Sequence, residues 1–164
     1  MAAGFALYKM SGANKSSASF STETNLGSKD DLTSLSTQMS ISVPETGTAY
    51  SYELWVKPKC SRAPFNNAYN FCIWYRGDNP STGCKLYGGS SLSYSAPSST
   101  KSTKATHDMI EYTSIGDSMP CGGHVNAIGS SFPYIILQIA CTSQAQSIYG
   151  NQTPMIIHYS YSED

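Results

Sequence analysis

Short runs of alternating or continuous apolar residues, separated by clusters of Gly, Pro, Ser and Asn, recur along the whole chain. No stretch between them carries the 3.6-residue apolar repeat of an amphipathic helix. The clearest runs are residues 50–56, 70–76, 134–140 and 155–161. About eight such runs, with turn residues between them, predict an all-β protein: a single antiparallel β-sandwich.

The 164 residues suffice for one domain with its own core. From residue 11 to 31 the side chains are small and polar, and only residues 17–22 alternate like a weak strand. We expect residues 1–31 to form an N-terminal arm, packed along a neighbour or the inner side of the sandwich, and residues 32–164 to form the sandwich. Pro58 and the Gly88-Gly89 pair are expected to end strands. Further strands are predicted at 32–43, 84–87, 109–115 and 125–128, and a long exposed loop of low complexity at 95–106.

Charged residues make up only 13% of the chain, whereas Ser, Thr and twelve Tyr are abundant. Soluble domains usually carry about 25% charged residues. The centres of subunit interfaces are poor in charge and rich in Tyr and Trp, so this composition favours a surface partly covered by neighbouring subunits. A monomeric sandwich that shows Ser and Thr to water is the alternative.

The cysteines indicate a reducing compartment. There are five of them, an odd number, which favours free thiols over a fully paired disulfide framework. The N-terminal residues lack the basic start and long apolar core of a signal peptide. No apolar run approaches the roughly 18 residues that cross a bilayer, so we expect no membrane partner.

The charges are unevenly distributed. Residues 57–104 hold seven bases and one acid, and residues 105–164 hold five acids and no base. Opposite potentials suit head-to-tail self-association, in which a basic surface of one subunit meets an acidic surface of the next. The basic set is Lys57, Lys59, Arg62, Arg76, Lys85, Lys101 and Lys104, and the acidic set is Asp108, Glu111, Asp117, Glu163 and Asp164.

The basic set also suggests contact with nucleic acid, with Tyr and Trp available to stack on bases. The pI of about 6.3 is low for a dedicated nucleic-acid binder, which usually exceeds about 9. A solvated basic rim is therefore the competing interpretation.

No motif for catalysis stands out. Cys121 and His124 lie three residues apart in Cys-Gly-Gly-His, a spacing that would serve a Cys/His nucleophile or half of a metal site. Tetrahedral zinc needs two more ligands, and neither His107 nor His158 has a cysteine close to it in the sequence. We therefore predict a protein that is not an enzyme and holds no cofactor. The carboxylates would allow Ca²⁺ between subunits, although none has the spacing of a calcium loop.

The start Met-Ala-Ala-Gly-Phe, the strand at 50–56 and the closing strands at 134–140 and 155–161 lie in a chain sparse in charge. In these features and in size the chain resembles small viral coat proteins of the satellite-virus type. The resemblance implies a jelly-roll-like sandwich that assembles into a closed icosahedral shell of about 60 copies around a small RNA genome. Such a protein is found in the virion, and in the host cytoplasm during assembly. Many of these coats carry a strongly basic N-terminal arm, whereas residues 1–29 here offer only three lysines.

Two other functions suit the same pattern. A carbohydrate-binding sandwich would stack Trp55, Trp74, Tyr87 or Tyr94 on sugar rings, and it would lose this platform if the two tryptophans were buried in cross-strand pairs. We expect Trp55 and Trp74 to meet across strands. A filament or phage-tail subunit would use the same charge complementarity without closing into a shell.

Overall fold

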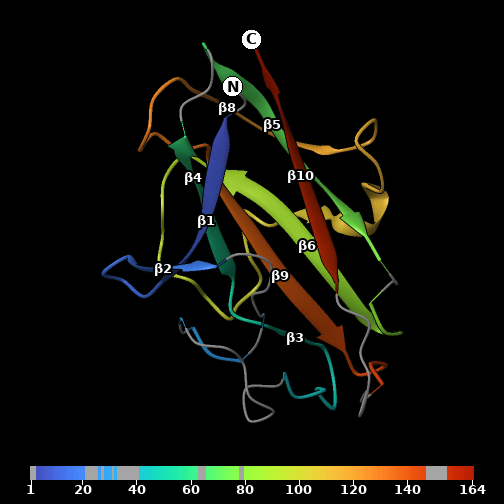
Figure 1. Cartoon of the computed structure of the whole chain (residues 1–164). Coiled ribbons are helices and arrows are strands. Elements are labelled where there is room, and N and C mark those ends of the chain that lie inside the picture. The colour runs from blue at the N-terminus through green and yellow to red at the C-terminus, as the bar shows by residue number, and fades with distance from the viewer. Residues whose placement is uncertain are drawn as a thin grey trace.

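The computed structural model describes residues 3–20, 26, 28–30, 32, 41–62, 66–77, 80–146 and 155–164. These residues form two antiparallel sheets packed face to face, joined by loops and one turn of 3-10 helix (Figure 1). The predicted fold class, an all-β antiparallel sandwich of jelly-roll-like form, is confirmed.

The larger sheet has seven strands in the order β2-β1-β4-β9-β6-β7, and β3 pairs with β9 on the same side as β4. Its strands are β1 (Gly4–Ser11), β2 (Ser16–Phe20), β3 (Thr48–Tyr50), β4 (Leu54–Arg62), β6 (Cys84–Ser91), β7 (His107–Asp108) and β9 (Tyr134–Thr142). The smaller sheet has the order β10-β5-β8, with β10 (Ile156–Glu163), β5 (Ala68–Arg76) and β8 (Met119–Val125). The 3-10 turn η2 (Met109–Glu111) follows β7.

The main core lies between the two sheets. Ile135 and Leu137 of β9 face it together with Phe71 and Ile73 of β5, and Ile139 is packed at its margin, as the alternation in β9 predicts. Phe132 is fully buried there, with its ring 4.9 Å from that of Phe5 and 4.7 Å from that of Phe71. The two sheets therefore share one apolar interior.

The structure places residues 4–20 in the sandwich instead of in a separate arm. β1 pairs with β4 from Gly4 to Met10, and Phe5 and Leu7 pack against the main core. This alternation gives β1 an apolar inner face, which is why the segment joins the sheet. The weak strand expected at 17–22 corresponds to β2. Most of the strand expected at 32–43 lies outside the described residues, and residues 41–43 form no strand.

Pro58 lies inside β4 and does not end it. Its carbonyl accepts a hydrogen bond from the Phe132 N–H at 3.1 Å. The N–H and carbonyl of one strand residue point to the same edge, so the N–H that proline lacks would face the loop before β9, beyond the paired part of that strand. The ladder with β1 on the other edge is therefore intact, with Leu7 opposite Pro58.

The Gly88-Gly89 pair does not end a strand as expected. Gly88 and Gly89 lie within β6, and both positions require glycine, because a Cβ would collide with the Met109 side chain at the first and with the Lys104 backbone at the second. Met109, fully buried, belongs to η2 and not to a strand at 109–115, and the Asp108 side chain accepts a hydrogen bond from the Ile110 N–H at the start of that turn. The strand expected at 125–128 is absent beyond Val125, which is the last residue of β8, and the strand at 119–124 was not predicted.

Candidate functional site: a lysine-covered face of the larger sheet

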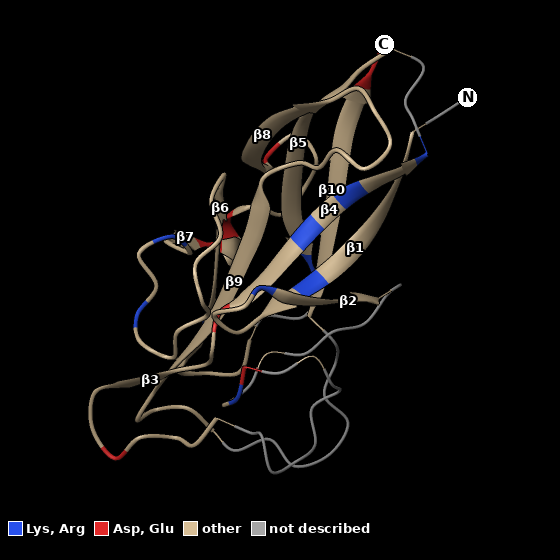
Figure 2. Ribbon diagram, turned by 90° about the vertical axis from the view of Figure 1, so that its left-hand side faces the viewer, with Lys and Arg blue, Asp and Glu red and all other residues tan. Residues whose placement is uncertain are grey.

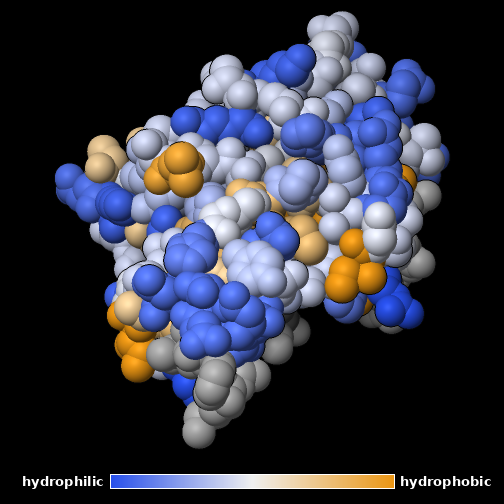
Figure 3. Space-filling model, turned by 90° about the horizontal axis from the view of Figure 1, so that it is seen from above, coloured by the Kyte–Doolittle hydropathy of each residue, from blue (hydrophilic) through white to orange (hydrophobic). Residues whose placement is uncertain are grey.

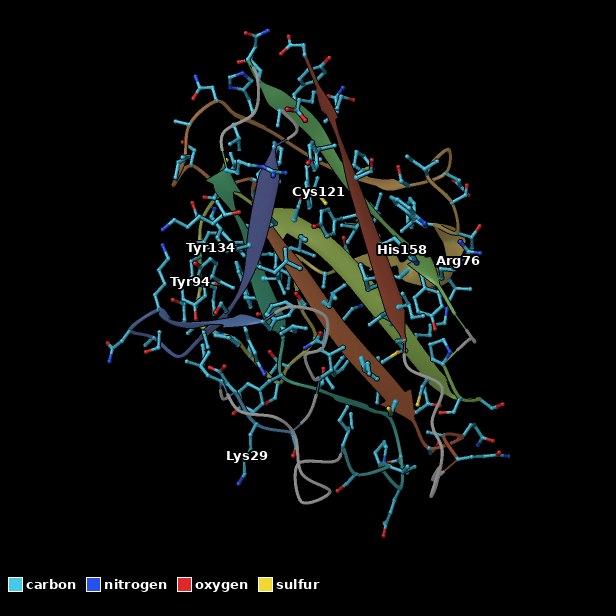
Figure 4. All side chains as sticks on the ribbon, viewed as in Figure 1. Lys29, Arg76, Tyr94, Cys121, Tyr134 and His158 are labelled. Carbon is cyan, nitrogen blue, oxygen red and sulfur yellow. The ribbon has the colours of Figure 1, made fainter. Side chains whose placement is uncertain are left out.

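The outward face of the larger sheet carries a second apolar cluster. We call Met10, Trp55, Ala105, Tyr134 and Ile136 the outer cluster. Trp55 is fully buried in it, with the Tyr94 ring at 5.2 Å and the Tyr134 ring at 5.6 Å, both edge to face. Tyr94 and Tyr134 lie on the same side of the molecule in Figure 4. Central strand β9 is thus buried on both faces, although a second sheet covers only one of them.

The outer cluster is covered by residues 92–106, which connect β6 to β7. Gln138 of β9, only 1% exposed, anchors this segment. Its side-chain carbonyl accepts from the Ser102 N–H at 2.8 Å, and its amide donates to the Thr100 and Ser51 carbonyls at 2.8 and 2.9 Å. The loop predicted at 95–106 is exposed at most of its positions, but hydrogen bonds fix its path, which its composition did not indicate. Hydrogen bonds to one buried amide hold a segment that composition alone would leave free.

A break between β3 and β4 makes room for this anchor. The Ser51 N–H and hydroxyl still bond to the backbone of Ile139, at 2.9 and 3.0 Å, but the Glu53 N–H turns to the Ser98 carbonyl at 3.0 Å. The predicted strand 50–56 is consequently divided. The buried Glu53 carboxylate accepts a hydrogen bond from the Trp55 indole N–H at 2.9 Å, which satisfies the polar atom of that ring.

Four lysines lie over the rings of this region. The Lys57 Nζ is 3.8 Å from the centre of the Tyr134 ring, and the Lys15 Nζ is 5.4 Å from it. Lys104 lies 5.6 Å from Trp55 and Lys59 lies 6.0 Å from Tyr8. These are distances at which a cation is attracted by the face of an aromatic ring. We call Lys15, Lys57, Lys59 and Lys104 the lysine face. Figure 2 shows basic segments along β4, the strand that carries Lys57 and Lys59.

The lysine face has an excess of positive charge. Between described residues the one ion pair joins Lys85 to Asp108, so no described carboxylate lies within 4 Å of any of these four ammonium groups. Partial burial, and then the charge of Lys15, lower the pKa of Lys57. Two like charges beside one ring repel each other, and an anion bound near both would relieve that repulsion.

Two of the rings beneath these lysines, Trp55 and Tyr134, are not available for stacking. Trp55 is 0% and Tyr134 is 3% exposed. The Tyr94 hydroxyl donates to the Gly12 carbonyl at 2.8 Å, and burial first, then Asp30 and Tyr134, raise its pKa to about 12. The face can therefore contact phosphate groups, but Trp55 cannot stack on bases as the sequence suggested.

The structure brings part of the basic set together. Lys57, Lys59 and Lys104 lie together on this face. Lys15 joins them, although it lies outside the predicted basic set, and nothing in the sequence around it except a tight turn indicates this position. The other members lie elsewhere: Arg62 at the end of β4, Arg76 at the end of β5, Lys85 on β6 and Lys101 in the covering segment.

The acidic set occupies several places and forms no single face. Asp108 lies 2.9 Å from Lys85 in the same chain, and Glu111 lies nearby in η2, so the pKa of Lys85 is raised by the Asp108 hydrogen bond and charge and, less, by Glu111. Asp117 is in a turn. Glu163 accepts from the Ala3 N–H at 2.9 Å, and Asp164 accepts from the Asn67 N–H at 3.0 Å.

The remaining candidate groups do not combine into a site. Trp74 of β5 stacks on His158 of β10, with ring centres 5.4 Å apart, and belongs to the smaller sheet, so it does not meet Trp55 as expected. Cys121 is buried, and burial raises its pKa to about 12, whereas His124 is exposed and bonds to Asn67. Figure 4 shows Cys121 in the interior. Cys121 and His124 are thus separated.

In the part of the chain that the structure describes, no group of three or more His, Cys, Asp or Glu is placed to hold a metal ion. None of the described residues forms a helix long and apolar enough to span a bilayer. The chain matches no protein-family model, and no curated protein or solved structure shows significant similarity to it.

Proposed function

We propose that this chain is a structural protein that assembles into a closed shell around a nucleic acid, as a viral coat protein does around a small RNA genome. The observation that carries the proposal is the lysine face: four ammonium groups on one surface, without carboxylate partners among the described residues. The whole chain has a net charge of −1, so this surface is positive only because the fold brings the four lysines together.

The buried rings favour contact with the phosphate backbone over reading of bases. Lysines contact phosphates without regard to sequence, and stacking would require the covered faces of Trp55 and Tyr134. Packaging demands this kind of contact, because a coat must hold a strand whatever its sequence. With four lysines, the contact is weak for one subunit and becomes strong when many subunits bind one strand.

Exposed apolar side chains support self-association. Leu92 is 83% exposed, Ile128 is 68% and Ile115 is 62% exposed, and these three lie in different loops. Figure 3 shows hydrophobic groups at separate places on the face seen from above. Separate apolar contacts suit a subunit with several different neighbours, the arrangement in a closed shell.

The carbohydrate-binding alternative keeps only part of its platform. Trp55 is fully buried and offers no face to a sugar, whereas Trp74 is half-buried and stacks on His158 of the neighbouring strand through one face. A filament subunit would use the same surfaces as a shell subunit and differ only in the angle between neighbours.

The first experiment measures the mass of the purified chain by light scattering, with negative-stain microscopy. A shell of about 60 copies of 17.7 kDa has a mass of roughly 1,060 kDa and appears as uniform small spheres. A monodisperse 17.7 kDa species, with and without single-stranded RNA, would contradict assembly.

The second experiment tests the lysine face on the dilute subunit with an oligouridine probe at several salt concentrations. Four phosphate contacts predict a slope of about −3 in log Kobs against log salt, and the Lys57→Gln/Lys59→Gln variant should halve it. Lys85→Gln is the matched control, since Asp108 already neutralises Lys85. Equal slopes in all three proteins would contradict a role for this face.

A further inference from the structure

Two cysteines of neighbouring strands face each other at one end of the larger sheet. Cys84, the first residue of β6, is the register partner of Cys141 in β9, and their sulfur atoms lie 3.0 Å apart. The Thr142 N–H donates to the Gly83 carbonyl at 2.8 Å, which makes 83 and 142 a hydrogen-bonded pair. Cys84 and Cys141 are therefore the adjacent non-hydrogen-bonded pair, in which Cα atoms approach to about 4.5 Å and both side chains lie on the same face.

We infer that Cys84 and Cys141 are a paired redox site that oxidises to a disulfide between β6 and β9. A separation of about 4.5 Å lies within the Cα range that a disulfide spans, so the bond needs no rearrangement of the sheet. The inference is independent of shell assembly and of the lysine face.

The other three thiols are not arranged to compete. Cys72 lies between the core residues Phe71 and Ile73 and so points to the outward face of the smaller sheet, whereas Cys121 belongs to the main core on the opposite face. The buried Cys60 thiol donates to the Arg62 carbonyl at 3.0 Å. One specific bond is thus expected from five cysteines.

The oxidation balances with a low-molecular-weight disulfide, such as oxidised glutathione, as the oxidant. The half-buried Cys84 thiolate attacks one glutathione sulfur and releases the first glutathione thiol, which leaves a mixed disulfide. The Cys141 thiolate then attacks the Cys84 sulfur and releases the second. Two protein thiols and one glutathione disulfide become one protein disulfide and two glutathione thiols.

The surroundings make this reaction slow at neutral pH. Burial, followed by the hydrogen bond with Cys84 and its charge, raises the pKa of Cys141 to about 12. Burial still acts on Cys141 once Cys84 is held in the mixed disulfide, so the fraction of Cys141 thiolate, and with it the rate of the closing step, increases with pH between 7 and 9. Such a pair suits slow disulfide formation after the protein leaves a reducing compartment better than rapid redox signalling.

The test treats the purified full chain with oxidised glutathione at pH 8.5, then unfolds it in guanidinium chloride with iodoacetamide so that the buried thiols are also blocked, and measures the intact mass. We expect three alkylated cysteines out of five and no retained glutathione. Trypsin alone cannot locate the bond, because residues 105–164 contain no Lys or Arg and hold both Cys121 and Cys141. Chymotrypsin cleaves between them after Tyr134, so the double digest should give a peptide that joins Cys84 to Cys141.

Cys84→Ser and Cys141→Ser should each prevent the bond, and Cys72→Ser, on the other sheet, should leave it unchanged. The oxidised chain should melt roughly 5–10 °C higher than the reduced chain, because the link closes a long loop in the unfolded state. Five alkylated cysteines, a link to Cys121, or a glutathione adduct that persists on Cys84 would each overturn the inference.

Discussion

The two faces of the larger sheet are buried by different means. On the inner face, Ile135 and Leu137 of β9 pack against apolar side chains of the smaller sheet. On the outer face, Trp55 and Ile136 are covered by a polar segment that Gln138 holds through backbone hydrogen bonds. An apolar cover gains free energy from any close packing, whereas a polar cover gains it only where each buried donor and acceptor finds a partner. Burial of the outer face should therefore depend more strictly on individual residues than burial of the inner face, and single substitutions should disrupt it more easily.

The largest effect is expected from a cavity on the inner face. Phe132→Ala removes a fully buried ring that contacts Phe5 and Phe71, and should lower the free energy of unfolding by about 3–5 kcal/mol. Urea denaturation measures this loss. Leu92→Ala, at an 83% exposed position, is the control and should change stability by less than about 0.5 kcal/mol. A similar loss in both variants would show that the inner core is not the main source of stability.

A smaller and more local effect is expected on the outer face. Gln138→Met keeps the shape of the side chain but leaves the Ser102 N–H and the Ser51 and Thr100 carbonyls without their partner, at a cost of about 2–3 kcal/mol. Hydrogen exchange should accelerate in residues 92–106 and remain slow in β5. Gln144→Met, at an exposed position, is the matched control. Equal acceleration in both regions would mean that the two faces open as one unit.

The smallest effect is the dependence of stability on pH, to which each face contributes through a different titrating group. Burial raises the pKa of Cys121 on the inner face from 9.0 to about 12, so the folded chain keeps this proton after the unfolded chain has lost it. Stability should therefore fall as the pH rises above 9, by about 1 kcal/mol for this thiol at pH 10. Tyr94 on the outer face, with its pKa raised from 10.0 to about 12, adds to the loss only above pH 10.

Urea midpoints at pH 8 and pH 10, in the presence of a reductant, measure this dependence. Cys121→Ala should reduce the difference between the two midpoints, and Cys72→Ala, which removes only the weaker effect of the Cys72 charge on the pKa of Cys121, should reduce it less. If Tyr94→Phe reduced it more than Cys121→Ala, the outer face would be the pH-sensitive one.

Strand periodicity predicted the parts of the fold in which the local pattern decides the structure. β5, β9 and β10 follow their alternating residues closely. Pro58 and Gly88 were misjudged because their effect depends on which edge or side chain lies next to them. The loop predicted at 95–106 is ordered by Gln138, about 40 residues away, which composition does not reveal.

The candidate site was predictable only in part, for a related reason. Lys57 and Lys59 are two residues apart on one strand, so alternation alone puts them on the same face. Lys15 and Lys104 join them through the register of β1 with β4 and the path of the covering segment. The pairing of Lys85 with Asp108, which removes one member from each charged set, also needs tertiary structure.

The position of β9 has a consequence for how the chain folds during synthesis. β9 lies between β4 and β6, so neither strand has its central neighbour until residues 134–142 have left the ribosome. Translation at about 5–20 residues per second needs roughly 4–14 s to pass from the end of β4 to the start of β9. During that time the edges of β4 and β6 are open and Trp55 and Leu86 lack cover, which makes the nascent chain a substrate for chaperones and for premature association with other copies.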